Sequence, residues 1–277
     1  MNSRDVSPQH YASFCTFLER ETGIVLGPSK QYLVRSRLVG LLHEYPELSI
    51  DSLVDKAVAG RDRKLQQQVV DAMTTNETLW FRDNYPFTLL SNEIIPALAK
   101  LNRKLRIWSA ACSTGQEAYS IAMTLFELQE KQPQSLKFGF EIIGTDISER
   151  VLQQATDGHY DAMAVVRGLS EPLQRKYFER RPDGTLVANS ALKRVTQFRK
   201  LNLISSYSAL GKFDVVFCRN VLIYFSADNK KLILQQIAAS LNAEGSLLLG
   251  ASESVAAVAD LFQMVKAANG LYYKKKS

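Results

Sequence analysis

The spacing of hydrophobic residues divides this chain into two parts. Up to residue 75, apolar side chains recur every three or four positions, as in the set Tyr11, Phe14, Phe17 and Leu18. This spacing is typical of amphipathic helices, and it predicts helices over residues 8–21, 30–44, 49–59 and 61–73. Gly23 follows the first of them and is expected to end it as a C-cap. The sequence therefore predicts an all-α N-terminal domain over residues 1–75, then a linker and connecting helix over 76–104.

From residue 105 onward, short apolar runs alternate with amphipathic helices. Strands are predicted over residues 105–110, 138–144, 213–218 and 246–250, with helices over 116–130, 148–155 and 228–241. This alternation favours a mainly parallel sheet wrapped by helices, which is an α/β fold. Near the end, Asn269-Gly270 lies between two apolar runs and predicts a closing antiparallel hairpin. Residues 105–277 are thus expected to form one α/β domain.

An insertion of different character interrupts this domain at about residues 175–198. Pro182-Asp183-Gly184 is a turn signal, and the apolar runs at 186–187 and 195–198 follow it, so we expect a small antiparallel β subdomain. The stretch that contains the insertion also carries the net positive charge of the chain, which is +6. Between residues 166 and 200 there are nine Lys and Arg against three Asp and Glu, whereas residues 1–75 contain nine of each sign. Such a stretch is either a solvated surface or a surface that attracts an acidic partner.

Composition excludes several classes of protein. No apolar run approaches the roughly 20 residues that a membrane span needs, and the polar N-terminus does not resemble a signal peptide. Cys15, Cys112 and Cys218 form no CxxC pair, and the three His residues show no metal-ligand spacing. We therefore expect a soluble, cytoplasmic protein with reduced cysteines and no metal site.

Three predicted strands end in residues that suit a ligand, and ligands in such sheets bind beyond the carboxyl ends of the strands. The first strand leads into Ala110-Ala111-Cys112-Ser113-Thr114-Gly115-Gln116-Glu117, where small residues precede a helix N-terminus. A tight turn would need small residues in any case. The second strand leads into Asp146, which either accepts the ribose hydroxyls of a nucleoside or caps the following helix.

The strand at 213–218 leads into Arg219-Asn220-Val221-Leu222-Ile223-Tyr224. An enzyme that methylates amino groups of nucleic-acid bases would usually carry an Asn/Asp-Pro-Pro-aromatic run at this strand end, and that run is absent. An Arg and a Tyr suit an anionic substrate better.

Five blocks in this order resemble the CheR family of chemotaxis-receptor glutamate methyltransferases: residues 73–82, 112–120, 145–147, 201–203 and 217–225. The resemblance implies a Rossmann-like S-adenosylmethionine-dependent methyltransferase sheet, an all-α N-terminal domain and a small inserted antiparallel β subdomain. It implies protein-glutamate O-methyltransferase activity in chemotaxis signal transduction, with S-adenosyl-L-homocysteine as the product. The implied partners are chemoreceptor cytoplasmic domains, through a C-terminal receptor peptide that docks on the inserted subdomain.

The resemblance also implies site residues. Those that hold or line the cofactor are Asn76, Thr78, Arg82, Glu117, Asp146, Asn202, Leu203, Arg219 and Asn220. Among them, Glu117 and Asp146 hold the amino-acid and ribose parts. Arg82 and Tyr224 are implied to lie near the transferred methyl group. The alternative for this pair is structural, with Arg82 paired to Glu77 or Asp83 and Tyr224 packed in the core.

Two other functions compete with this interpretation. A nucleic-acid methyltransferase could use the basic insertion to attract phosphates, and a cofactor-binding sensor could keep the fold without activity. The missing Pro-Pro motif argues against the first. Arg82, Asp146 and Tyr224 occurring together argue against the second.

Overall fold

The computed structural model describes residues 6–276, which divide into two compact units. One unit contains the chain up to residue 75 together with residues 224–229, and the other contains residues 76–223 and the chain from 230 onward. Among the helices of residues 6–276, none combines the length and apolar character that a bilayer span requires.

The N-terminal unit is helical, as the sequence predicts. Its elements are α1 (Pro8–Thr22), α2 (Gln31–Leu38), the 3₁₀ helix η1 (Val39–His43), α3 (Ile50–Ala59) and α4 (Arg63–Met73). Gly23 ends α1 with φ 78°, and its N–H donates to the Glu19 carbonyl, so the predicted C-cap is confirmed. The apolar faces meet in a core that includes Phe14, Leu18 and Leu53.

The prediction of one helix over residues 30–44 was wrong in its second half. The α-helix ends at Leu38, and residues Val39–His43 continue as a 3₁₀ helix. Gly40 lies at the start of this tighter segment, and glycine costs about 1 kcal/mol in an α-helix relative to alanine. The weak helix former therefore coincides with the change in geometry.

A broken helical segment precedes the sheet of the second unit. It consists of α5 (Tyr85–Leu89), the π-helix η2 (Leu90–Ile94) and α6 (Ile95–Leu98). Just before it, Phe81, Asp83 and Asn84 have φ values of 48°, 68° and 49°. These values lie in the left-handed region, which non-glycine residues seldom adopt and which is common at functional sites.

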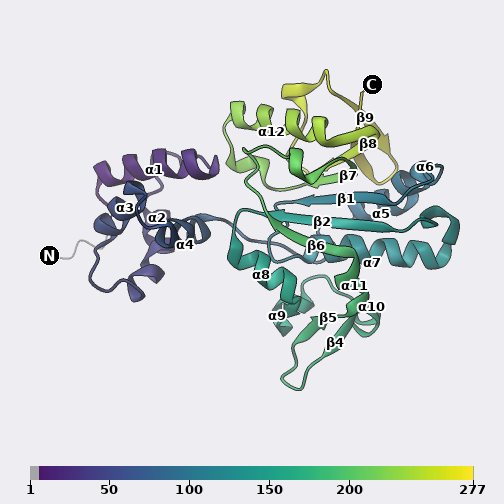
Figure 1. Ribbon diagram of the computed structural model, residues 1–277, viewed down its shortest axis with the longest axis horizontal. Helices are drawn as coiled ribbons and strands as arrows, with labels where there is room; N and C mark the ends of the chain where they lie inside the picture. Colours follow the sequence, from purple (N-terminus) through teal and green to yellow (C-terminus); the bar gives the residue numbers. More distant parts are fainter. Residues whose placement is uncertain (1–5, 277) are drawn as a thin grey trace. The chain divides into compact units, whose positions relative to one another are not determined.

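Within residues 6–276, seven strands form one sheet in the order β6-β2-β1-β7-β8-β10-β9. Five of them run parallel, and β10 is antiparallel to both β8 and β9. The strands are β1 (Leu105–Ala110), β2 (Phe140–Asp146), β6 (Thr196–Lys200), β7 (Phe213–Cys218), β8 (Leu241–Leu249), β9 (Phe262–Ala267) and β10 (Gly270–Lys275). The longer helices of the unit are α7 (Gln116–Lys131), α8 (Glu149–Asp157) and α12 (Ala227–Ser240) (Figure 1).

The parallel strands lie in the core of this unit. Every residue of β7 is buried, and Ile107, Trp108 and Ile142 on neighbouring strands are 0% exposed. Strands covered on both faces carry continuous apolar runs, which is the pattern that predicted them. Four short 3₁₀ helices also occur within residues 76–276: η3 (Pro133–Leu136), η4 (Ser208–Leu210), η5 (Leu222–Tyr224) and η6 (Ala256–Val258).

A separate antiparallel sheet forms the small subdomain, in the order β3-β5-β4. Its strands are β3 (His159–Tyr160), β4 (Phe178–Arg180) and β5 (Leu186–Ala188), and α9 (Ala162–Val166), α10 (Glu171–Tyr177) and α11 (Ser190–Val195) accompany it. Figure 1 shows β4 and β5 at the foot of the view, beside these helices. The small sheet thus begins at His159, ahead of the turn that signals it in the sequence.

The sequence interpretation of residues 195–198 was wrong. They were expected in the antiparallel insertion, but Thr196–Lys200 forms β6, which pairs in parallel with β2 in the large sheet. A Cβ on Gly144 of β2 would lie 2.7 Å from the ring of Phe198. The glycine leaves room for that ring, and this long-range fit cannot be seen in a local pattern.

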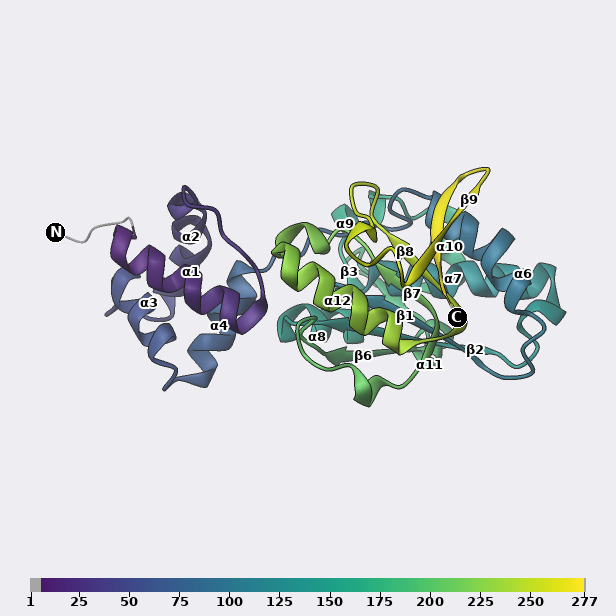
Figure 2. The same ribbon diagram turned by 90° about the horizontal axis from the view of Figure 1, so that it is seen from above.

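The closing hairpin is confirmed, with its turn one residue earlier than predicted. Gly270 pairs with Ala267, so Ala268 and Asn269 form the turn. A Cβ on Gly270 would lie 2.6 Å from the ring of Tyr85. Close packing against Tyr85 is therefore one reason for glycine at this position. Figure 2 shows this hairpin in yellow, seen from above.

Candidate functional site

The order of the strands places the candidate site where the chain direction across the sheet reverses. From β1 the chain proceeds outward to β2 and β6 on one side, and β7 and β8 lie on the other. Ala110 pairs with both Thr145 and Cys218, so the carboxyl ends of β1, β2 and β7 are adjacent. This is the position where open parallel sheets bind their ligands.

The turn between β1 and α7 has a constrained backbone. Ala111, Ser113 and Gly115 have φ values of 56°, 51° and 92°. A Cβ on Gly115 would lie 2.9 Å from the Cβ of Ala155 in α8 and 3.2 Å from the Phe198 ring. Glycine is therefore required at residue 115, because any side chain would push α7 away from α8 and β6.

Asp146 connects this turn to the next one. Its Oδ2 accepts from the Ser113 backbone N–H at 2.9 Å, and its Oδ1 accepts from the Ser148 N–H at 3.0 Å. The N-cap of α8 is Ser148, whose Oγ accepts from the Val151 N–H. Asp146 is therefore more than a helix cap. Asp146 is buried, and its carboxylate holds both turns in place at the ends of β1 and β2.

Glu117, Arg219 and Asp83 form an ion chain beside the same strand ends. Arg219 donates through Nη1 to Glu117 at 3.1 Å and through Nη2 to Asp83 at 2.6 Å. The Arg219 side chain is only 1% exposed. A buried cation is costly unless it is paired, and here two carboxylates pair it. Glu117 also accepts from Ser109 Oγ at 2.7 Å.

Two buried polar atoms lack a partner in the described part of the chain: Arg219 Nε and Asn220 Oδ1. Buried polar groups are rarely left unsatisfied in native proteins, and exceptions often mark binding sites. Asn220 also has φ 57°, a backbone conformation that non-glycine residues seldom adopt. One orphaned donor and one orphaned acceptor at the end of β7 could be satisfied by a polar ligand.

The segment that carries Arg82 is held to this site. Arg219 Nη2 donates to the Arg82 carbonyl at 3.0 Å, and the Phe81 N–H donates to Ser120 Oγ at 3.1 Å. Arg82 itself is partly exposed, and its Nη1 donates to the Glu77 carbonyl at 3.4 Å. The Glu77 carboxylate pairs with Arg167 and the Asp83 carboxylate pairs with Arg219, so Arg82 contacts Glu77 through its backbone carbonyl.

Sequence reasoning missed Glu253, which fixes the strand end after β7. Its Oε1 accepts from the N–H groups of Val221 and Leu222 at 2.9 and 2.8 Å. Its Oε2 accepts from those of Asn220 and Gly250, both at 2.8 Å. One carboxylate thus satisfies four backbone donors. An acid three residues after the glycine that follows β8 was the only signal for it.

The remaining predicted residues lie as follows. The Asn76 carbonyl accepts from Ser113 Oγ at 2.8 Å, and Thr78 is partly buried two residues further on. Asn202 and Leu203 follow the end of β6, and the Leu201 N–H donates to the Asp146 carbonyl at 2.9 Å, which places this segment beside the end of β2. Tyr224 belongs to the N-terminal unit, where its carbonyl accepts from the Val25 N–H at 3.0 Å.

The cysteines near the site are poor nucleophiles. Burial raises the pKa of Cys112 and of Cys218 well above the usual thiol range. The reactive form of cysteine is the thiolate, which these two side chains do not supply at neutral pH. Within residues 6–276 no group of three or more His, Cys, Asp or Glu side chains is arranged to hold a metal ion.

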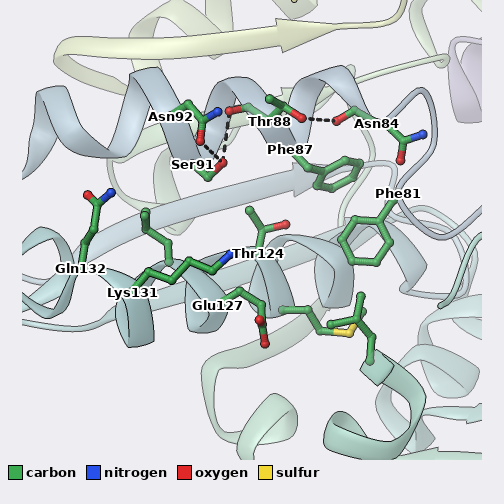
Figure 3. Close-up of a pocket in the computed structure, with 13 residues that line it drawn as sticks. Phe81, Asn84, Phe87, Thr88, Ser91, Asn92, Thr124, Glu127, Lys131 and Gln132 are labelled. Atoms are coloured by element: carbon green, nitrogen blue, oxygen red, sulfur yellow. Dashed lines mark hydrogen bonds between the residues drawn. The ribbon is translucent and has the colours of Figure 1, made fainter. Parts of the chain in front are cut away.

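A separate cavity of about 320 Å³ lies between α7 and the α5–η2 helix (Figure 3). Phe81 and Phe87 contribute rings to it, and Thr88, Ser91 and Thr124 contribute hydroxyl groups. Ser91 Oγ donates to the Thr88 carbonyl at 3.2 Å. The Phe81 ring lines this cavity, and the Phe81 backbone N–H donates to Ser120 Oγ.

Comparison with known proteins agrees with this architecture. Residues 76–271 match the family model described as CheR methyltransferase, SAM binding domain. Residues 9–74 match the model described as CheR methyltransferase, all-alpha domain. The two models meet close to residue 75, where the two compact units also divide.

Several curated proteins are similar over almost the full length. Chemotaxis protein methyltransferase 1 of Vibrio cholerae serotype O1 is 51% identical over 276 residues, covering 100% of both chains. The Pseudomonas aeruginosa protein with the same name is 48% identical, covering 95% of this chain and 96% of its own. The chemotaxis protein methyltransferase of Borreliella burgdorferi is 33% identical, covering 84% and 83%.

Proposed function

Because this chain belongs to the CheR methyltransferase family, we propose that it methylates glutamate side chains on the cytoplasmic helices of chemoreceptors. The family activity is methyl transfer from S-adenosylmethionine in chemotaxis. The proposed product on the receptor is a glutamate methyl ester, which serves sensory adaptation. The proposed location is the cytoplasm, where those receptor helices lie.

The observation that carries the proposal is the ion chain Glu117–Arg219–Asp83, in which the central Arg219 is buried. It joins the strand ends that suit the cofactor to the segment that presents Arg82. The guanidinium of Arg82 suits an anionic substrate, and a carboxylate is an anion that Arg binds in a bidentate manner.

For the cofactor, we assign roles that fit the donors and acceptors present. Asp146 accepts from the ribose hydroxyls, and Glu117 with the orphaned Asn220 Oδ1 accepts from the ammonium group. Asn202 and Leu203 flank the adenine, and the residues lining the rest of the pocket are Asn76, Thr78, Arg82 and Arg219. The bound cofactor supplies a methyl group that its sulfonium activates.

The protein's task is then to position the substrate. A glutamate carboxylate with a pKa near 4.3 is ionised at neutral pH, so no general base is needed. Arg82 orients that carboxylate with one oxygen toward the methyl group. The resemblance to the family assigns Tyr224 to the same step, as a residue that helps to exclude water. Correct positioning can contribute roughly 7–11 kcal/mol in the best intramolecular reactions.

We also propose that a receptor peptide docks on the small sheet. β4 is an edge strand of that sheet, and an edge strand can pair with an extended peptide.

The basic stretch of residues 166–200 is less cationic than its sequence indicates, because acids from other helices pair with two of its lysines. Glu127 and Glu130 pair with Lys176, and Glu149 pairs with Lys200. Arg180, Arg181 and Arg194 remain exposed and are the better candidates to attract an acidic partner.

The experiment that tests this function is transfer from methyl-labelled S-adenosylmethionine to receptor-containing membranes, with total RNA in a parallel reaction. We expect label in the receptor and none in RNA. Base should release the label as methanol, because carboxyl esters hydrolyse and methylated amines do not. Arg82→Ala should bind the cofactor and fail to transfer. Label in RNA but not in receptor would support the nucleic-acid alternative instead.

A further inference from the structure

The helix α9 exposes two large apolar side chains. Met163 is 78% exposed and Val166 is 77% exposed, the highest values among large apolar residues in the described part of the chain. They are three residues apart, so they lie on the same face of the helix. Single exposed apolar residues are ordinary, but an adjacent pair of this exposure indicates a contact surface when it lies beside a functional site.

The helix α9 is fixed to the segment that carries Arg82. Trp80 Nε1 donates to the Ala164 carbonyl at 3.0 Å, and the Trp80 N–H donates to the Arg167 carbonyl at 3.3 Å. A Cβ on Gly168, which has φ 108°, would lie 2.4 Å from the Trp80 carbonyl oxygen. The two backbones therefore approach as closely as glycine allows.

The same helix is also fixed to the cofactor turn. Tyr160 precedes α9, and its Oη donates to the Thr114 carbonyl at 2.8 Å. Its ring packs edge-on against Trp80, with centroids 4.8 Å apart. α9 is thus anchored at both ends, one anchor on the turn between β1 and α7 and one on the Arg82 segment.

Charged groups connect the apolar pair to Arg82. Arg167, the residue after α9, pairs with the Glu77 carboxylate at 3.1 Å. The Glu77 carbonyl accepts from Arg82 Nη1 at 3.4 Å. Arg167 and Glu77 are half or more exposed, and exposed pairs of this kind contribute about 0–1 kcal/mol. Arg167 can therefore exchange Glu77 for an acid on a partner at little cost.

We propose that Met163, Val166 and Arg167, called the α9 face below, dock the helix that presents the glutamate to Arg82. This inference rests on the proposed function. On a helix, the residues three or four positions from the glutamate lie on its own face, about 5–6 Å away. Apolar residues at those positions cover Met163 and Val166, and a second acid pairs with Arg167. The partner is therefore an amphipathic helix with an acid and an apolar residue spaced by three or four.

Methionine suits this task because its flexible side chain adapts to different contacts. One α9 face can thus accept several glutamate sites that differ in their neighbours. Substrate selection then depends on the residues around each glutamate, in addition to any peptide that tethers the enzyme.

The test is the double variant Met163→Ser/Val166→Ser, assayed on receptor-containing membranes. We expect the KM for receptor to rise about tenfold, while kcat and the Kd for S-adenosylmethionine stay within about twofold of wild type. The matched control is Met264→Ser/Leu271→Ser, which removes apolar side chains that are 51% and 38% exposed on β9 and β10. That control should leave all three constants unchanged. Near-identical Tm values would show that both variants fold.

A receptor variant tests whether the helix that carries the glutamate is what contacts the α9 face. Serine in place of the apolar residue three or four positions from one glutamate should raise the KM of the wild-type enzyme for that site. It should have little further effect on the double variant, because the same contact is already lost. Additive effects would overturn the proposal.

Three other outcomes decide between the docking proposal, the proposed function and self-association. A KM equal to wild type in the double variant, with wild-type enzyme active on the receptor, would overturn the docking proposal and leave the proposed function standing. No receptor methylation by wild-type enzyme would instead remove the proposed function. If sedimentation shows a wild-type dimer that the double variant abolishes, a second copy of this chain covers the α9 face and the proposal is wrong.

Discussion

We propose that Asp146 combines a structural and a ligand-binding task in one carboxylate. Its two oxygens satisfy the backbone N–H groups of Ser113 and Ser148. These bonds fix the two turns at the ends of β1 and β2, where we propose that the nucleoside binds. A side chain of this kind is sensitive to substitution in two ways, through the turns and through the ligand.

We predict that Asp146→Ala weakens binding of S-adenosylmethionine by about 100-fold, because the ribose loses its acceptor and both turns lose theirs. Asp146→Asn keeps one acceptor oxygen and should lose about tenfold. Calorimetric titration measures both affinities, and circular dichroism checks that the variants fold. Unchanged affinity in Asp146→Ala would contradict the ribose assignment.

The sequence could indicate Asp146 but not Glu253. Asp146 follows an apolar strand at a spacing that many nucleotide-binding folds share. Glu253 lies 33 residues from the Asn220 N–H that it accepts, in a loop with no such pattern. Arg219 likewise pairs with Asp83 across 136 residues of chain. Long-range ion pairs of this kind depend on which loops the fold brings together, and one sequence does not reveal that.

A carboxylate lies at each end of strand β7: Asp214 at its start and Glu253 beside its end. The two accept hydrogen bonds from different groups. Asp214, the second residue of β7, accepts from Arg103 at 2.8 Å, from the Arg106 N–H at 2.9 Å and from Asn242 at 2.8 Å. Burial opposes its ionisation, but Arg103 and the other donors outweigh burial and lower its pKa below the ordinary range. Glu253 holds the opposite end, where the site lies.

These two carboxylates form a matched pair for mutagenesis. Glu253→Gln places an amide N–H₂ against backbone donors, so the loop from Asn220 to Leu222 should shift. We predict that kcat for methyl transfer falls about tenfold, with a smaller loss of cofactor affinity. Asp214→Asn lies at the far end of the strand, and its kcat and KM should stay near wild type. Equal kinetic effects in both variants would mean that Glu253 acts only through overall stability.

The pH dependence of stability separates the pair further. The folded pKa of Asp214 is depressed, so its contribution to stability is fully present above the unfolded pKa near 3.9 and is lost as pH falls through the folded pKa. Asp214→Asn should therefore lower the free energy of unfolding by about 2 kcal/mol at pH 7. The difference from wild type should vanish in strong acid, where the wild-type carboxylate is protonated.

The elements were more predictable than their connections. The strands at 105–110 and 213–218 have the predicted bounds, because buried parallel strands carry unbroken apolar runs. Residues 195–198 were misplaced because a short edge strand looks the same in either sheet. The π-helix Leu90–Ile94 was not foreseen, since no local composition distinguishes it from an α-helix.

For the molecule as a whole, the sequence indicated the fold class and the family, and tertiary contacts changed the interpretation of its charge. The nine basic residues between 166 and 200 appeared to form one cationic surface. In the structure, Lys176 pairs with acids of α7 and Lys200 pairs with Glu149 of α8. Charge counted along a chain overestimates a patch when the fold brings opposite charges beside it.

The most direct test of the central claim is to identify the residue that receives the methyl group. Purified receptor is incubated with the enzyme and methyl-labelled S-adenosylmethionine, and peptides are sequenced by mass spectrometry under acidic conditions that preserve esters. The account predicts label on glutamate side chains of the receptor's cytoplasmic helices, and loss of label at a site when its glutamate is replaced by alanine. Label on lysine, on a chain terminus or on nucleic acid, with receptor glutamates unmodified, would contradict it.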